Sequence, residues 1–197
     1  MENIIKFAVV MLSAVTLENI VFTRALGVDK STITAKSQKS ILTFGLITTL
    51  LIILSVSINY FFNFWIGKYV KTAMVHYMIC FVSSILSYII VVSAIKKIDY
   101  NFYFKTKQMF LLSMFTGCVY GTVLVVSIHP GDFIFALANA LGSGIGFTLS
   151  MFLVHMGRER IALLNVPRAF KGVPIMLLYL GILSLAIYGL IGHQLPA

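Results

Sequence analysis

Residues 41–66 read ILTFGLITTLLIILSVSINYFFNFWI and contain no Asp, Glu, Lys or Arg. About 20 predominantly apolar residues are enough for a helix to cross the hydrocarbon core of a bilayer, and this run is longer. A helix also satisfies its own backbone N–H and C=O groups, which lipid cannot do. The run therefore predicts a transmembrane helix and an all-α integral membrane fold.

Five further apolar runs extend this prediction to six transmembrane helices. They are residues 3–22, 73–95, 109–128, 133–156 and 173–191. Six spans take about 120 residues, so the remainder of the 197-residue chain suffices only for loops and termini. We therefore expect one multi-pass membrane domain over residues 1–197.

The composition supports a lipid-covered surface. Of the residues, 59% are hydrophobic and 11% are charged, and the mean hydropathy is +0.99. A soluble domain carries about 25% charged residues. The net charge of +9 does not indicate nucleic-acid binding, because the cations lie in short segments between apolar runs.

The positions of these cations predict a topology. Segments 23–40, 96–108 and 157–172 carry four Lys or Arg residues each, and the remaining three are Lys6, Lys68 and Lys71. Cytoplasmic loops carry the excess of Lys and Arg, so the first, third and fifth connections are expected in the cytoplasm and both termini outside. Two inverted three-helix repeats, about 1–100 and 101–197, follow from this arrangement.

The fifth run carries small residues four apart. Such a stripe lies on one face of a helix and lets two backbones approach closely. Helix packing is the simpler interpretation, and the alternative is that the stripe makes room for a cofactor or an ion. The sequence GSGIG at residues 142–146 is not a dinucleotide-binding motif, because it lacks the pattern GxGxxG and does not follow a predicted strand. The stripe consists of Ala138, Gly142, Gly146 and Ser150.

Glu18 is the acid that lies within an apolar run. Acids inside membranes often belong to ion or proton pathways. The alternative is an interfacial carboxylate paired with Arg24 or a loop lysine, and the sequence leaves both open. The polar residues Asn19, Asn59 and Asn139 are expected to hydrogen-bond between helices.

No catalytic residues are predicted, because the chain shows no nucleophile–base pair and no carboxylate dyad. The two cysteines, Cys80 and Cys118, are far apart in the sequence and lack the spacing of a metal motif. Taken alone, each behaves as a small buried hydrophobic residue.

The segments ALGSGIGF (140–147), RERIA (158–162), VP (166–167) and FKG (170–172) resemble the family formed by the RnfA, RnfE, NqrD and NqrE subunits, and its RnfA branch most. The resemblance extends to Glu18-Asn19 and Leu26-Gly27, and so covers nearly the whole chain.

This resemblance implies a membrane component of an Rnf- or Nqr-type oxidoreductase that moves Na⁺ or H⁺ across a bacterial or archaeal cytoplasmic membrane. The complex would be a ferredoxin:NAD or NADH:quinone oxidoreductase. The implied partners are the other components of the complex, among them a homologous RnfE- or NqrD-like membrane subunit. The chain itself is not expected to bind nicotinamide or flavin, because it lacks a nucleotide motif.

The resemblance also implies a [2Fe-2S] cluster shared between two homologous subunits. Thr116-Gly117-Cys118 matches the family's second cysteine motif, which makes Cys118 a candidate iron ligand. Asp29 occupies the first cysteine position, two residues after Leu26-Gly27. A carboxylate is a harder ligand than a thiolate and suits iron–sulfur chemistry poorly. Two alternatives follow: a cluster held by three cysteines and Asp29, or a cluster-free paralogue acting as a transporter, channel or assembly partner.

Overall fold

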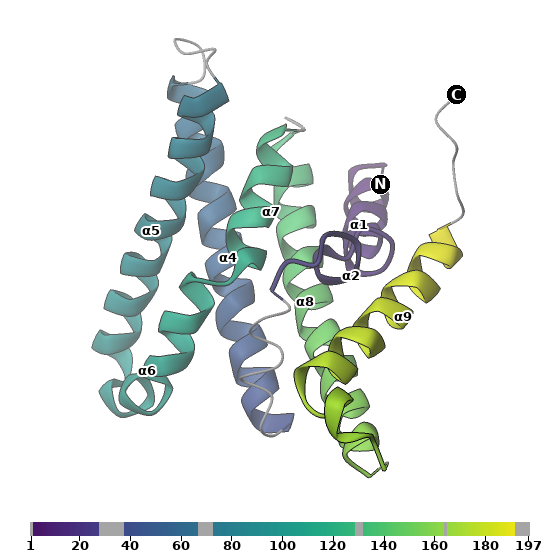
Figure 1. Ribbon diagram of the computed structural model, residues 1–197. Helices are drawn as coiled ribbons and strands as arrows, with labels where there is room; N and C mark the ends of the chain where they lie inside the picture. The colour runs from purple at the N-terminus through teal and green to yellow at the C-terminus, as the bar shows by residue number, and fades with distance from the viewer. Residues whose placement is uncertain (1, 28–37, 67–72, 129–131, 164, 192–197) are drawn as a thin grey trace.

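A computed structural model describes residues 2–27, 38–66, 73–128, 132–163 and 165–191, and every regular element in these ranges is a helix (Figure 1). The elements are α1 (Glu2–Val15), α2 (Ile20–Arg24), α4 (Gln38–Ile66), α5 (Ala73–Ile98), α6 (Tyr100–Met114), α7 (Gly117–Ile128), α8 (Phe133–Ala162), the 3-10 turn η1 (Arg168–Phe170) and α9 (Val173–Ile191). The all-helical class predicted from the sequence is confirmed.

Among the described residues, three helices are long and apolar enough to cross a membrane, namely α4, α5 and α8. The pair α6 and α7, bent by 46° at its junction, is a fourth candidate when the two helices are counted as one span. Helices α1 and α9 are apolar but shorter. Large apolar side chains such as Trp65, Met74 and Leu185 are more than 70% exposed, as expected for side chains that contact lipid tails.

Two of the predicted continuous helices are broken. The run 3–22 divides into α1 and α2, with Asn19 as the N-cap of α2. The run predicted at 109–128 begins earlier, because the Asp99 side chain caps α6 by accepting a hydrogen bond from Phe102 N (3.0 Å). It is interrupted before α7, where the Thr116 hydroxyl donates to Leu112 O (2.9 Å). Side chains that bond the local backbone in this way compete with continuous helix.

The ends of the helices agree with the distribution of cations. Figure 1 shows the start of α4, the junction of α5 with α6 and the junction of α8 with α9 at one end of the bundle. Segments 96–108 and 157–172 and the later part of segment 23–40 meet the helices there, whereas Arg24 lies on α2. Lys105 and Lys107 lie on α6 itself rather than in a loop.

Helices α4 and α8 cross in the centre of the bundle through two reciprocal contacts. A Cβ added to Gly45 would collide with the Thr148 side chain, and a Cβ added to Gly144 would lie 2.6 Å from Thr49 Cγ2. Each threonine lies four residues after the glycine of its own helix. Each glycine thus makes room for the threonine of the other helix, which lets the two backbones approach closely.

Candidate functional site

The site is built where the two helix breaks meet. The chain leaves α2 through Ala25, which has a left-handed conformation (φ 54°), and Gly27, which has φ 88°. Leu26 then seats on the first turns of α7: a Cβ at Gly117 would lie 3.5 Å from Leu26 Cδ2, and one at Gly121 would collide with Leu26 Cδ1. The segment after α2 is thereby packed against the start of α7, where the helix pair α6 and α7 is broken.

Gly27 is required at this contact for two reasons. Its positive φ is strained for an L residue, and a Cβ there would lie 2.8 Å from Phe147 Cε2 and 3.4 Å from Thr116 Cγ2. Leu26-Gly27, which precedes the first cysteine position of the family pattern, and Thr116-Gly117-Cys118 are therefore in van der Waals contact, although about 90 residues separate them in the sequence.

Cys118 lies in the first turn of α7, directly after this contact, and its side chain is 0% exposed. Its carbonyl accepts a hydrogen bond from the Thr122 hydroxyl (2.8 Å). Asp29, the second predicted ligand, lies outside the described residues. Within the described part of the chain no group of three or more His, Cys, Asp or Glu residues could hold a metal ion.

The residues present fit an iron–sulfur cluster in part. The Cys118 thiol is a suitable donor, and the contact between the two breaks brings the family's two ligand segments together. The carboxylate at position 29 does not match the preference of iron–sulfur clusters for thiolates. A cluster at this place would therefore need most of its ligands from a second chain.

Asn19 holds the first break in place. Its Nδ2 donates to Val15 O and to Gly146 O (both 3.0 Å), and its Oδ1 accepts from Val21 N (3.1 Å) and the Ser150 hydroxyl (3.0 Å). The side chain is 1% exposed, so all these bonds are made away from solvent. The amide thus joins the α1–α2 turn to the middle of α8.

The prediction of interhelical hydrogen bonds is confirmed for two of the three asparagines. Besides Asn19, Asn59 on α4 donates to the Ser127 hydroxyl on α7 (2.6 Å). Asn139 differs, because its Oδ1 accepts from Ser143 one turn further along the same helix (3.2 Å). The role of Asn19 as the anchor of a helix break was not predicted. An asparagine directly after an acid within an apolar run is the signal that indicates such a break.

Replacing Asn19 by alanine is expected to lower the free energy of unfolding by about 2 kcal/mol, because buried groups lose their partners. The change should be measured by denaturant or thermal unfolding of the purified protein in detergent. Asn101→Ala is the control, since Asn101 is exposed on α6 and should leave stability nearly unchanged. Equal effects of the two substitutions would contradict the anchoring role of Asn19.

The small-residue stripe of α8 faces α1. A Cβ at Gly142 would lie 2.5 Å from Met11 O and 2.7 Å from Ala14 Cβ. A Cβ at Gly146 would lie 3.0 Å from Asn19 Nδ2. Backbone and side chains of this same chain therefore fill the space beside both glycines. The remaining stripe members, Ala138 and Ser150, are 0% exposed.

Glu18 lies at the depth of the middle of α8, because the neighbouring Asn19 contacts Gly146. The Glu18 side chain is exposed and borders a cavity of about 510 Å³. Arg24, Val125 and Asn139 line the same cavity, so it lies between α2, α7 and α8.

The structure defines the class as a helical membrane bundle with two broken helices, and comparison with known proteins identifies the family. The family described as "Rnf-Nqr subunit, membrane protein" matches residues 7–193. Because this match covers nearly the whole chain, the protein belongs to the Rnf-Nqr family.

Individual relatives are similar over nearly their full lengths. The A-type subunit of the ion-translocating oxidoreductase complex of Aromatoleum aromaticum is 29% identical, over 95% of this chain and 97% of the relative. Its counterpart in the Na⁺-translocating ferredoxin:NAD⁺ oxidoreductase complex of Acetobacterium woodii is 28% identical, over 94% and 97%. The counterpart in the proton-translocating ferredoxin:NAD⁺ oxidoreductase complex of Clostridium ljungdahlii is 27% identical, over 94% and 96%.

Proposed function

We propose that this chain is the A-type membrane subunit of a complex that couples electron transfer to the movement of Na⁺ or H⁺ across the cytoplasmic membrane of a bacterium or archaeon. The observation that carries the proposal is the meeting of the two helix breaks, Leu26-Gly27 against Thr116-Gly117, within a chain similar to A-type subunits over nearly its whole length. One relative is named for Na⁺ and another for protons, so the coupling ion is left to experiment.

The proposed topology has six spans, counting α1 with α2 as one and α6 with α7 as another. Both termini lie outside, because the Lys- and Arg-rich segments meet the helices at one end of the bundle. A broken helix leaves backbone groups without partners in the bilayer, so it is tolerated only where protein or a water-filled cavity satisfies them. In the first half, the Asn19 side chain supplies those partners.

A [2Fe-2S] cluster, if held at this junction, would supply one-electron transfer within the membrane. Cys118 is the proposed ligand from this chain. Because Asp29 does not supply a thiolate, a homologous RnfE- or NqrD-like subunit would provide the remaining thiolate ligands. In the single chain Cys118 is enclosed. Sharing its sulfur with a partner therefore requires that neighbouring side chains separate when the partner binds.

Glu18 is proposed to contact the translocated cation. Its carboxylate is exposed, lies level with the middle of α8 and borders a cavity of about 510 Å³. Acids within a membrane are energetically costly, and those that occur there usually have a function. Arg24 lines the same cavity and would compete with the cation for the carboxylate.

The proposal is tested by tagging the chain in its own membranes, extracting it gently and identifying the co-purifying proteins by mass spectrometry. We expect a homologous membrane subunit together with flavin and iron–sulfur subunits of an Rnf- or Nqr-type complex. Recovery of the chain alone or with unrelated proteins would contradict this role. That outcome would favour the cluster-free paralogue, for which Asp29 is the supporting feature.

A further inference from the structure

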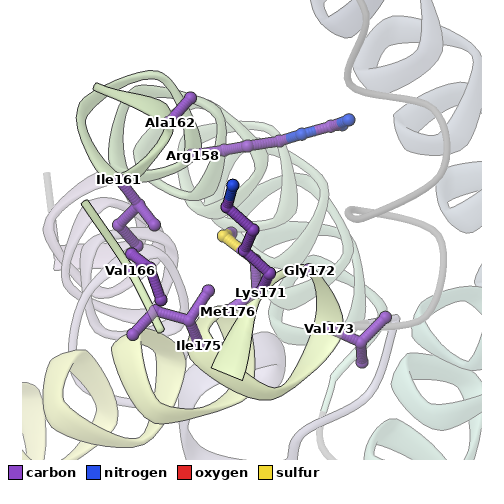
Figure 2. Close-up of a pocket in the computed structure, with 9 residues that line it drawn as sticks. All are labelled: Arg158, Ile161, Ala162, Val166, Lys171, Gly172, Val173, Ile175 and Met176. Atoms are coloured by element: carbon purple, nitrogen blue, oxygen red, sulfur yellow. The ribbon is translucent and has the colours of Figure 1, made fainter. Parts of the chain in front are cut away.

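A second cavity lies between the end of α8 and the start of α9, at the end of the bundle where the cation-rich segments meet the helices (Figure 2). Its volume is about 300 Å³. Apolar side chains form much of its wall, namely Ile161, Val166, Ile175 and Met176. None of these residues belongs to the junction around Cys118.

The chain turns so that a lysine ammonium enters this apolar cavity. After η1, Lys171 is extended (φ −60°, ψ 137°) and Gly172 has φ +90°. This reversal starts α9 at Val173 and leaves Lys171 above the first turn. Figure 2 shows the Lys171 ammonium pointing into the cavity between Ile161 and the Arg158 side chain. A Cβ at Gly172 would meet nothing within 4 Å, so the cavity wall is open there.

An apolar lane leads away from the cavity along α9. Val173 lines the cavity and is 62% exposed, and Leu177, one turn further on, is 54% exposed. At Gly181, another turn on, an added Cβ would meet nothing within 4 Å. The cavity therefore opens onto the exposed apolar face of α9.

We propose that this cavity binds one anionic phospholipid. Its phosphate would lie against the Lys171 ammonium with Arg158 at the rim, and an acyl chain would follow Val173 and Leu177 along α9. Cationic pockets between helices at a membrane surface attract anionic headgroups. The apolar wall and lane favour a lipid over free phosphate, because burial of an acyl chain adds hydrophobic stabilisation that phosphate cannot provide.

The test uses the full-length protein in nanodiscs that contain phosphatidylcholine with a minor share of phosphatidylglycerol. After mild delipidation, the phospholipids that remain bound are counted by native mass spectrometry. We expect retention of phosphatidylglycerol over phosphatidylcholine, and about fivefold weaker retention in Lys171→Gln, which corresponds to about 1 kcal/mol for a lysine at the surface. Lys107→Gln is the matched control, because Lys107 is exposed on α6, the helix that begins at the same end of the bundle.

Further arms separate the possible occupants. Val173→Ser keeps the charge but shortens the apolar lane, and it should also weaken retention. Equal retention in Lys171→Gln and Lys107→Gln, or no preference for phosphatidylglycerol, would overturn the proposal. Displacement of the lipid by millimolar inorganic phosphate would assign the cavity to free phosphate. If co-purified subunits protect the Lys171 amine from a chemical acylating reagent and added lipid does not, the cavity would be assigned to a protein contact. Either assignment would also overturn the proposal.

Discussion

Cys118→Ser is expected to abolish the [2Fe-2S] signal of the purified complex, while Cys80→Ser leaves it intact. A serine oxygen is a harder ligand than a thiolate and does not replace it well in an iron–sulfur cluster. The measurement is the electron paramagnetic resonance spectrum of the reduced complex, together with its iron content. Both cysteines are 0% exposed, so the pair controls for the general cost of altering a buried thiol.

The expected difference between the two cysteines rests on their positions. Cys118 follows the contact between Leu26-Gly27 and Gly117, whereas Cys80 lies on α5 with its sulfur 3.2 Å from the Ser127 hydroxyl. An unchanged signal in Cys118→Ser would remove Cys118 as a ligand. Loss of the signal in Cys80→Ser instead would move the ligand assignment to Cys80.

Asp29 offers a complementary substitution within the same experiment. Asp29→Cys would restore the thiolate that the family pattern places after Leu26-Gly27. If the cluster is held by three cysteines and Asp29, this variant should show a sharper or more stable signal than the wild type. The same complex and the same spectra serve for both positions.

Gly142→Val is expected to lower the free energy of unfolding by about 3 kcal/mol or more, because overpacking forces the backbone to move. The new Cβ would lie 2.5 Å from Met11 O, a backbone atom, so rotation of a side chain cannot relieve the clash. Helix α1 must move away from α8, and the contacts of Asn19 with Gly146 and Ser150 would weaken with it.

The measurement is unfolding of the purified protein in detergent, with assembly into the complex as a second readout. Gly181→Val is the matched control, since it makes the same substitution within a helix where a Cβ meets nothing within 4 Å. Similar losses for both variants would show that the close approach of α1 and α8 contributes little, and that the change reflects only the helix propensity of glycine and valine.

Much of the fold class could be predicted from the sequence because lipid imposes it. A run such as 41–66 has to cross a bilayer as a helix whatever its neighbours do, since only a helix satisfies its own backbone there. The family could be identified for a related reason: the motifs from 140–147 to 170–172 are local strings that need no knowledge of tertiary contacts.

The helix breaks were decided by tertiary structure. An apolar run predicts where a segment can enter lipid, but it does not show that Asn19 bonds Gly146 and Ser150 on another helix. These partners lie more than 120 residues away, and they hold the Asn19 amide in the position from which it bonds Val15 O and Val21 N at the break.

The sequence by itself determined an apolar helical bundle with an asymmetric distribution of cations and the motifs of one membrane family. Only the tertiary structure placed Leu26-Gly27 against Thr116-Gly117 and turned Lys171 into an apolar cavity. The physical reason is that hydropathy acts residue by residue, whereas these placements depend on close approaches between distant segments. A glycine permits such an approach because it has no Cβ, but the sequence does not indicate which other helix will pack against it.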